Sequence, residues 1–293
     1  MGRLDGRVAI VLGAAGQGNM GQTIARRFAA EGAKVVVAGR NAEPLAALAA
    51  EIGGAHALCD ITKKADVEAL ADHALEQYGR LDVAVNCTGW GLLAKLLDTS
   101  EEQLDALAAL QFKGTYFFLQ ACVGRMAERG GGSVITISSA SVYALLYHHA
   151  AYIATKAAAD ALVRCFANEF GAKGVKVNAI APGLTESPMT GRDMNTPGLV
   201  ELFAKEYPLG RIGTGEDVAN AALWLATAES FLTRGVIMAK CDARRRVGAG
   251  RLRTWRKRNP LNRDTLWPVS VPSHIPQALC RQAIRKTRRR SRV

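Results

Sequence analysis

Residues 8–21 read VAIVLGAAGQGNMG, and this stretch decides the fold. Its first five residues are apolar and rich in β-branched side chains, which predicts a buried strand over Val8–Leu12. A glycine-rich turn follows, and the next segment, Thr23–Glu31, has helical spacing and ends at Gly32. A strand that runs through glycines into a helix aims backbone N–H groups and the helix dipole at one point. The stretch therefore predicts a phosphate-binding turn.

The same alternation of strands and helices continues along the chain. Further strand-like runs lie at 35–38, 56–58, 83–86, 133–138 and 175–180, and helical stretches lie at 45–52, 67–78, 104–126 and around 152–160. The stretch 104–126 reads as one long helix or as two abutting helices. Continuous apolar strands between helices are typical of a parallel sheet that is covered on both faces. We therefore predict an α/β fold, a Rossmann-type doubly wound parallel sheet in three αβα layers, as a single domain over 1–240.

A basic extension follows the predicted domain. Residues 1–240 carry 22 Lys and Arg against 24 Asp and Glu, whereas residues 241–293 carry 16 against 2. The net charge of +12 therefore comes from the tail, which has no apolar period and which we predict to be disordered or loosely packed. Nonspecific binding of nucleic-acid phosphates is an alternative role for the tail, but we do not expect a nucleic-acid partner.

Composition limits the class of protein further. The 293 residues are 49% hydrophobic and 22% charged, which is enough apolar material for a buried core. Because no apolar run has the length of a bilayer span and no signal peptide precedes the first strand, we predict a cytoplasmic protein without a membrane partner. The six cysteines have no paired spacing, so we interpret them as small buried residues in a reducing compartment and predict no metal site.

The helix at 152–160, YIATKAAAD, places Tyr152 and Lys156 four residues apart and so on one face. A free phenol has a pKa of about 10, and a neighbouring ammonium favours the phenolate and lowers that pKa. Ser139 stands at the carboxyl end of the strand 133–138, where its hydroxyl can polarise a carbonyl. The three residues predict proton transfer to a carbonyl beside a bound nicotinamide, whereas a surface pair on a helix is the alternative.

Arg40 follows the second strand, at the position that faces the adenosine ribose in a dinucleotide-binding fold. An acidic residue there would accept hydrogen bonds from free ribose hydroxyls, whereas a small residue followed by Arg suits a 2′-phosphate. We therefore predict NADP(H) as the favoured cofactor and keep NAD(H) as the alternative. The alternative interpretation is that Arg40 is a solvated arginine at a strand end and binds no ligand.

Seven stretches together resemble the classical short-chain dehydrogenases/reductases over about residues 4–235. They are LDGRVAIVLGAAG at 4–16, CDIT at 59–62, LDVAVNCTG at 81–89, SVITISSAS at 133–141, YIATK at 152–156, VKVNAIAPGLTESPM at 175–189 and PLGRIGTGEDVANAALWLA at 208–226. The resemblance implies that Tyr152 is the catalytic acid and base, that Lys156 lowers its pKa and binds ribose, and that Ser139 positions the substrate. It also implies a homo-oligomer, either a dimer or a tetramer.

The resemblance assigns a cofactor site as well. Asp60 matches the family's adenine-contacting acid, Asn86 and Gly89 match the element beside the cofactor, and Pro182-Gly183 matches the loop that passes the nicotinamide. Ser187 stands where the family often has Thr. The predicted cofactor-binding residues are Gly13, Gly18, Asn19, Met20, Gly21, Arg40, Asp60, Ile61, Asn86, Gly89, Tyr152, Lys156, Pro182, Gly183, Leu184 and Ser187.

Three features depart from the family pattern. The turn from Gly13 to Gly21 is two residues longer than usual and has Asn19 where a glycine would align, and we expect Asn19 to tolerate a left-handed backbone. Gln111 stands in place of the family's catalytic Asn, which holds a water next to the Lys, so Gln111 joins the predicted catalytic residues. The family's Asp-Gly-Gly element is absent after residue 237, which puts the usual tetramer interface in doubt.

These residues predict an NADP(H)-dependent oxidoreductase that interconverts a ketone and a secondary alcohol. Enoyl reductases, a related branch, have six residues between Tyr and Lys, and His149 occupies that Tyr position here, so we expect C=O rather than C=C chemistry. The predicted pocket wall is apolar and favours a small-molecule carbonyl or alcohol with a hydrophobic part, such as a β-ketoacyl thioester, a steroid or a cyclic alcohol. The wall comprises Trp90, Leu92, Leu145, Tyr147, Leu184 and Met189. A non-catalytic dinucleotide sensor, suggested by Gln111 and the altered turn, is the alternative.

Overall fold

The structure is a computed structural model that describes residues 1–188, 201, 204, 205, 207, 209–230, 233 and 235–239. All of these belong to the first of two units of the chain, Met1–Arg245. The tail 241–293 and the predicted wall residue Met189 lie outside the described residues. The domain boundary at residue 240 and the disorder of the tail therefore stay predictions.

Seven strands form one parallel sheet in the order β3-β2-β1-β4-β5-β6-β7. They are β1 (Val8–Leu12), β2 (Lys34–Gly39), β3 (Ala55–Leu58), β4 (Val83–Asn86), β5 (Gly132–Ile137), β6 (Val175–Ala181) and β7 (Ile237–Ala239). The order reverses between β1 and β4, whose register sets Leu12 beside Asn86 at the carboxyl ends of both strands. Ligands of doubly wound sheets bind in the crevice at such a reversal.

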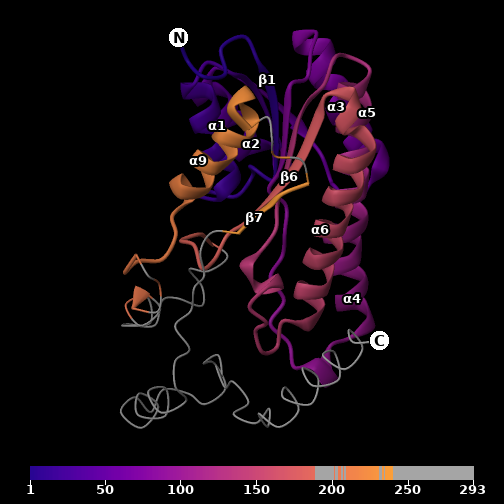
Figure 1. Cartoon of the computed structure of the whole chain (residues 1–293), viewed down its shortest axis with the longest axis vertical. Coiled ribbons are helices and arrows are strands. Elements are labelled where there is room, and N and C mark those ends of the chain that lie inside the picture. The colour runs from indigo at the N-terminus through magenta and orange to yellow at the C-terminus, as the bar shows by residue number, and fades with distance from the viewer. Residues whose placement is uncertain are drawn as a thin grey trace, which may run out of the picture. The chain divides into compact units, whose positions relative to one another are not determined.

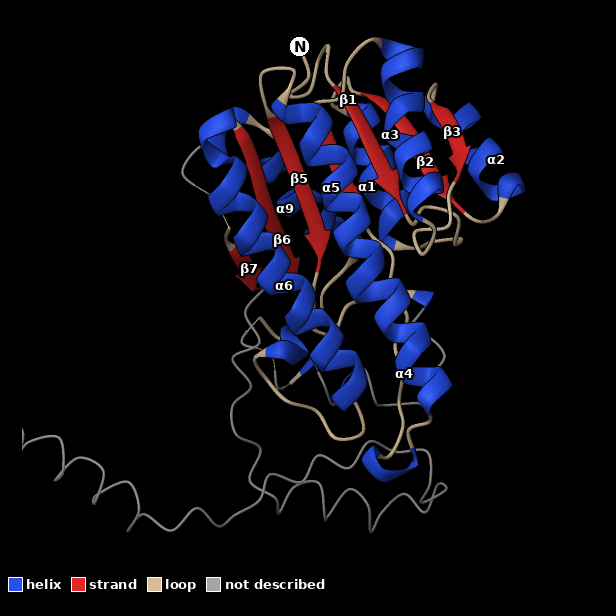
Figure 2. Cartoon of the chain, turned by 90° about the vertical axis from the view of Figure 1, so that its right-hand side faces the viewer, coloured by secondary structure: helices blue, strands red, loops and turns tan. Residues whose placement is uncertain are grey.

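Helices cover both faces of the sheet (Figures 1 and 2). One face carries α1 (Met20–Ala30), α2 (Ala42–Ile52) and α9 (Gly215–Ala226), and the other carries α3 (Lys64–Tyr78), α5 (Gly114–Ala127) and α6 (Ala150–Phe170). Phe28 is fully buried under the first layer and Phe118 under the second. Because both faces of each inner strand are buried, the strands read as unbroken apolar runs, and the predicted three-layer αβα sheet is confirmed.

The boundaries differ from the sequence prediction in a regular way. Helices α1, α2 and α3 each begin three residues before the segment that apolar spacing indicates. The first turns of α2 and α3 are largely solvated and so carry no apolar period, whereas the first turn of α1 buries Gly21 and Gln22 and is capped by Asn19. The stretch 104–126 forms two helices, α4 (Glu101–Leu107) and α5, joined by the π-helical segment Ala108–Lys113. Strand β7, which pairs with β6, is an element that the sequence prediction did not include.

Four cysteines lie among the described residues, and none forms a disulfide. Cys59 and Cys122 are buried as predicted, Cys87 is partly exposed, and Cys165 is exposed, so the prediction is wrong for Cys165, which lies on the outer face of α6. The described residues contain no cluster of three or more His, Cys, Asp or Glu side chains placed to hold a metal ion. In the same residues, no helix has both the length and the apolar character needed to cross a bilayer.

Candidate active site

The glycine turn after β1 requires glycine at both of its ends. Gly13 has φ 95°, and a Cβ on it would lie 2.8 Å from the backbone carbon of Cys87. A Cβ on Gly21 would lie 2.6 Å from the carbonyl oxygen of Gly13. Only glycine therefore lets the turn, the start of α1 and the segment after β4 approach this closely.

Asn19 holds the long turn together from inside. Its side-chain Nδ2 donates to the Gly13 carbonyl at 2.8 Å, and its Oδ1 accepts from the backbone N–H of Gln22 at 2.9 Å as the N-cap of α1. Its φ of −81° is extended, so Asn19 does not use the left-handed backbone that asparagine tolerates. Gly18 takes the left-handed conformation instead, with φ 65°, and its N–H donates to Gln22 Oε1 at 3.1 Å.

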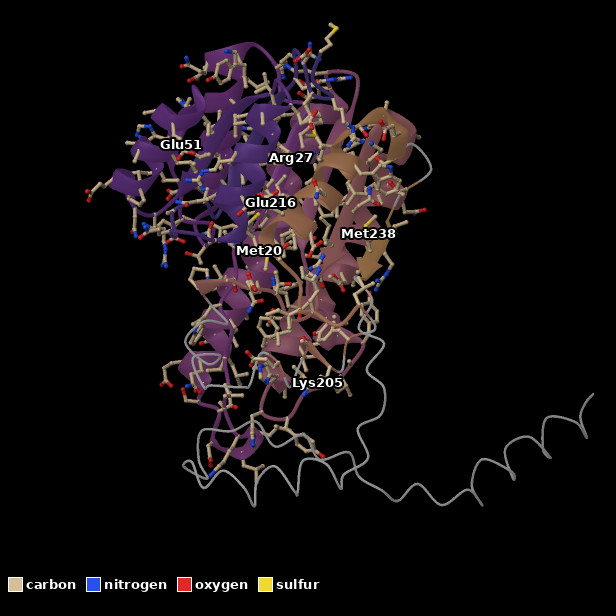
Figure 3. All side chains as sticks on the ribbon, turned by 90° about the vertical axis from the view of Figure 1, so that its left-hand side faces the viewer. Met20, Arg27, Glu51, Lys205, Glu216 and Met238 are labelled. Atoms are coloured by element: carbon tan, nitrogen blue, oxygen red, sulfur yellow. The ribbon has the colours of Figure 1, made fainter. Side chains whose placement is uncertain are left out.

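Met20 begins α1 and lies at the end of the helix next to the turn. Figure 3 shows Met20 at this end, with Arg27 farther along α1 and Glu216 on the neighbouring helix α9. The first turn of a helix offers backbone N–H groups without intrahelical partners, and the positive end of the helix dipole lies there. The turn and the start of α1 are thus built like an anion site.

Arg40 and Asp60 lie at the carboxyl ends of β2 and β3. Arg40 is exposed, and Asp60 Oδ1 accepts hydrogen bonds from the backbone N–H and the hydroxyl of Thr62 at 3.0 and 2.8 Å. Burial raises the pKa of Asp60, but the Thr62 bonds and the charges of Arg40 and Lys63 lower it below its ordinary value overall. The two predicted cofactor residues are therefore electrostatic neighbours. Ile61, in contrast, lies in the core and leaves only its backbone for a ligand.

Asn86 ends β4, and the segment that follows it passes from the glycine turn at Cys87 to α6 at Gly89. Asn86 is buried, and its Oδ1 accepts from the backbone N–H and the hydroxyl of Thr88 at 2.9 and 2.7 Å. Its Nδ2 donates to the Thr115 hydroxyl at 3.4 Å. A Cβ on Gly89 would lie 3.4 Å from Lys156 Nζ, so Gly89 borders the amine of the predicted catalytic lysine.

Tyr152, Lys156 and Ser139 converge at the carboxyl end of β5. Lys156 Nζ donates to the Ile137 carbonyl at 2.7 Å and lies 6.0 Å from the centroid of the Tyr152 ring. Ser139 Oγ accepts from the backbone N–H and the hydroxyl of Ser141 at 3.3 and 2.9 Å. The hydroxyl proton of Ser139 is thereby left for another acceptor.

Burial has the largest effect on the pKa values of Tyr152 and Lys156. Burial raises the pKa of Tyr152, and a hydrogen bond with Ser139 lowers it only in part. The lowering of the phenol pKa by the Lys156 ammonium stays a prediction. Burial lowers the pKa of Lys156 to about 8, against the charges of Asp160 and Cys87, which raise it.

Gln111 lies in the π-helical segment and is 2% exposed. Its Nε2 donates to the Trp90 carbonyl at 3.0 Å, while its Oε1 is buried without a hydrogen-bond partner among the described residues. The amide therefore fixes the backbone that follows Gly89. It also directs an acceptor into the protein, where the family's Asn would bind water by resemblance.

The loop after β6 is fixed beside Ser139. The Pro182 carbonyl accepts from the Ala140 N–H at 2.9 Å, and Thr185 Oγ1 donates to the Gly183 carbonyl at 3.0 Å. The Leu184 N–H donates to the Tyr207 hydroxyl at 2.8 Å. Ser187 lies farther along the loop and is partly exposed. The loop of Pro182, Gly183 and Leu184 is thus attached to the segment that follows Ser139, and its contact with a nicotinamide stays a prediction.

The predicted wall residues differ in how far their side chains are exposed to solvent. Leu92 is buried and Leu184 is partly buried, whereas Trp90 and Tyr147 are exposed and Leu145 is 77% exposed. The exposed part of the predicted wall is therefore apolar. The observation agrees with a site that receives a partly apolar molecule.

Three residues at the site were missed by sequence reasoning. Thr88 and Thr115 hold Asn86, and their hydroxyls have no distinguishing pattern in the sequence. Asp160 lies buried beyond Lys156 on α6. Its signal was present in the sequence, because Tyr152, Lys156 and Asp160 follow one another at steps of four residues.

A family model described as enoyl-(acyl carrier protein) reductase matches residues 13–240. The chain is 34% identical over 238 residues to a D-threitol dehydrogenase from Mycolicibacterium smegmatis, covering 80% of this chain and 90% of the relative. It is 35% identical over 243 residues to a 7alpha-hydroxysteroid dehydrogenase from Escherichia coli K12, covering 80% and 93%.

Solved structures agree with these relatives. A short-chain type dehydrogenase/reductase from Mycobacterium ulcerans superposes with a TM-score of 0.77 at 29% identity, over 82% of this chain and 90% of that one. A gluconate 5-dehydrogenase from Burkholderia cenocepacia, in complex with NADP and tartrate, superposes with a TM-score of 0.77 at 29% identity, over 82% and 95%.

Proposed function

Because this chain belongs to the classical short-chain dehydrogenase/reductase family of NAD(P)-dependent alcohol oxidoreductases, we propose that it uses NADP(H) to interconvert a ketone and a secondary alcohol. One observation carries the proposal. Tyr152, Lys156 and Ser139 meet at the carboxyl end of β5, and Gly89 borders the lysine amine on the cofactor side.

The residues present fit a dinucleotide. The glycine turn and the first turn of α1 suit the pyrophosphate, Asp60 suits the adenine, and the exposed guanidinium of Arg40 suits a 2′-phosphate. A carboxylate that would repel a phosphate does not occupy the end of β2, because Gly39 and Arg40 stand there. The bound NADP of the Burkholderia structure supports the same preference.

Proton transfer follows from the buried phenol. When bound, the nicotinamide supplies or accepts the hydride. Because burial raises the pKa of Tyr152, the phenol is protonated at neutral pH and is ready to donate to the oxygen of a ketone. The Ser139 hydroxyl donates to the same oxygen and stabilises its developing charge, since Ser141 already supplies the bonds that Ser139 Oγ accepts. The Lys156 ammonium holds the ribose hydroxyls next to Gly89.

The site disfavours C=C reduction despite the description of the matching family model. Enoyl reductases would need a phenol where this chain has His149. The Nδ1 of that imidazole is within hydrogen-bonding distance, 2.8 Å, of the Tyr147 carbonyl, at the start of α6. A ketone with a hydrophobic part suits the exposed apolar side chains Trp90, Leu145 and Tyr147. Among the relatives, both a steroid alcohol and a polyol dehydrogenase occur, so the substrate panel must include both classes.

NADPH oxidation with a panel of β-ketoacyl thioesters, ketosteroids, cyclic ketones, ketoses and an enoyl thioester tests the proposal. We expect turnover of at least one ketone, and a loss of about 10²- to 10⁴-fold in Tyr152→Phe with NADPH binding retained. Tyr78→Phe is the matched control, because Tyr78 ends α3, just before the chain enters β4 at its amino end, whereas the proposed site lies at the carboxyl ends of the strands. Tight NADPH binding without oxidation by any ketone would favour the dinucleotide sensor. Full activity of Tyr152→Phe would overturn the assigned role.

We also propose a cytoplasmic homo-oligomer, a dimer or a tetramer. Tyr116 and Phe112 are exposed, and the Tyr116 ring packs edge-on against Phe166 of α6 at 5.6 Å between ring centroids. Phe166 in turn stacks on Phe170 at 5.9 Å, so an aromatic row crosses α5 and α6. Exposed aromatic rows are typical of protein interfaces. Light scattering coupled to size-exclusion chromatography should give two or four chains per particle, and a monomer at micromolar concentration would contradict the proposal.

A further inference from the structure

Helix α6 carries three polar side chains at successive steps of four residues, namely Tyr152, Lys156 and Asp160. Lys156 is 6% exposed and Asp160 is 2% exposed. A buried carboxylate is costly unless other groups compensate for its charge. Asp160 is therefore a buried acid to which the proposed proton and hydride transfer assigns no role.

The end of β5 faces these three turns of α6. The Ile137 carbonyl accepts from Lys156 Nζ at 2.7 Å. The hydroxyl of the next residue, Ser138, lowers the pKa of Asp160, and the hydroxyl of Ser139 lowers the pKa of Tyr152. Three consecutive residues at the end of β5 thus interact with side chains on three successive turns of α6. Asp160 belongs to the same assembly as the proposed catalytic residues, not to a separate surface.

The surroundings of Asp160 contain few compensating groups. Burial raises its pKa, whereas the Ser138 hydroxyl and the charges of Lys156 and Arg164 lower it in part. Burial and then the charge of Asp160 raise the pKa of the Tyr143 phenol, so Tyr143 is an electrostatic neighbour of Asp160. Neither oxygen of Asp160 has a hydrogen bond of good geometry to any described residue. The carboxylate therefore interacts with Lys156 through space, across one helical turn.

Few groups stabilise the charged form of the Lys156 amine. Burial lowers the pKa of its amine to about 8, and the two groups that raise it are Asp160 and then Cys87. Burial raises the pKa of the Cys87 thiol to about 12, so Cys87 is neutral in the working pH range. Asp160 is consequently the main negative charge that stabilises the ammonium. A neutral amine would still reach the Ile137 carbonyl but would bind ribose more weakly and would no longer stabilise a phenolate.

We propose that Asp160 is a positioning residue that acts through Lys156, because its carboxylate keeps the amine protonated over the pH range in which Tyr152 exchanges its proton. The catalytic consequence rests on the proposed function, but the coupling between the two charges is a property of the folded chain alone. The two parts can therefore be tested separately.

The charge coupling is measured without cofactor or substrate. The protein is labelled with [13C]lysine, the Lys156 Cε signal is assigned by its loss in Lys156→Arg, and its titration is followed by NMR. In Asp160→Asn, which keeps the shape and removes the charge, the Lys156 titration should move to lower pH. Glu169→Gln is the matched control, because Glu169 is an exposed acid on the same helix, and it should leave the titration in place. An unchanged Lys156 titration in Asp160→Asn overturns the proposal, whether or not the protein turns over a ketone.

The catalytic consequence is read from the pH profile of ketone reduction. The alkaline limb of kcat/KM should move to lower pH in Asp160→Asn, so that activity at pH 8 falls about 5- to 50-fold while activity at pH 6 changes much less. A residue that only supported the fold would lower activity equally at all pH values. A uniform loss therefore overturns the proposal.

Two further variants keep the test decisive if Asp160→Asn does not fold. Asp160→Ser is neutral and smaller, and it should show the same shifts of the Lys156 titration and of the alkaline limb. Asp160→Glu keeps the charge and should retain the wild-type limb. A wild-type limb in Asp160→Ser, or a shifted limb in a folded Asp160→Glu, contradicts the proposal.

Discussion

The side-chain amide of Gln111 donates a 3.0 Å hydrogen bond to the backbone carbonyl of Trp90. This bond joins the π-helical segment before α5 to the segment that follows Gly89, and it does so inside the protein. The residue that departs from the family pattern is therefore part of the support of the site. Its geometry explains how an extra methylene is accommodated, because a π-helical turn widens the helix locally.

Gln111→Asn should destabilise the protein and slow catalysis. The shorter amide does not reach the Trp90 carbonyl, and an unpaired buried acceptor costs about 1–3 kcal/mol of unfolding free energy. Urea denaturation and kcat/KM are the measurements. Gln120→Ala, on the exposed side of α5, is the control and should stay within about 0.5 kcal/mol. Full stability of Gln111→Asn would show that the bond to Trp90 contributes nothing.

Asn19→Ala should loosen the glycine turn. The change removes both the N-cap bond of α1 and the bond to the Gly13 carbonyl, at a cost of about 1–2 kcal/mol in thermal or urea unfolding without cofactor. Asn41 is a matched control, because it is the N-cap of α2 but makes no side-chain cap bond, so Asn41→Ala should cost only a few tenths of a kcal/mol. Equal losses of unfolding free energy in the two variants would contradict the conclusion that the Asn19 side chain stabilises the turn.

Arg40→Ala should change the cofactor preference. Losing a charge-assisted contact to a 2′-phosphate should raise the KM for NADPH about 10- to 100-fold while leaving the KM for NADH nearly unchanged. Arg129→Ala, an exposed arginine near the amino end of β5, is the control for loss of one positive charge. If the KM values for NADPH and NADH rise by the same factor, Arg40 does not bind the 2′-phosphate. The proposed preference for NADP(H) would then lose the residue on which it mainly rests.

Asp82→Asn should weaken the opposite end of the sheet and change its response to acid. Asp82 Oδ2 accepts from the Val8 N–H at 2.9 Å, and its carboxylate pairs with Arg80 at 2.6 Å and with Arg7 at 2.8 Å. Burial raises the pKa of Asp82, but these bonds lower it below its ordinary value overall. We expect Asp82→Asn to cost about 1–3 kcal/mol at pH 7.

The sign of the pH dependence follows from the lowered pKa of Asp82. The stabilisation is present above the pKa of the unfolded chain, about 3.9, and is lost as the pH falls through the lower pKa of the folded state. Urea unfolding from pH 7 to pH 3 should therefore show a steeper loss in the wild type than in Asp82→Asn. Asp105→Asn, at an exposed position of α4, should follow the wild type. Parallel curves for the wild type and Asp82→Asn would contradict the assignment.

Much of the site was predictable because its residues stand at fixed positions relative to strand ends. Strands β1 and β4 have the bounds that their apolar runs indicate, and Tyr152 and Lys156 share a face of α6 because helical geometry is local. The conformation of Asn19 was not predictable in this way. Whether that residue is left-handed or capping depends on where the Gly13 carbonyl lies, which is set across the turn.

The sequence by itself determined most of the order of strands and helices, the glycine-rich turn between β1 and α1 and the i, i+4 placement of Tyr152 and Lys156, since backbone periodicity and glycine chemistry act over a few residues. Only the tertiary structure decided the protonation of the site. Burial raises the pKa of Tyr152 and lowers that of Lys156 to about 8, and the buried Asp160 opposes the second effect. The free energy of a buried charge depends on solvent exclusion and on groups brought from distant parts of the chain, and these arise only when β5 and α6 pack together.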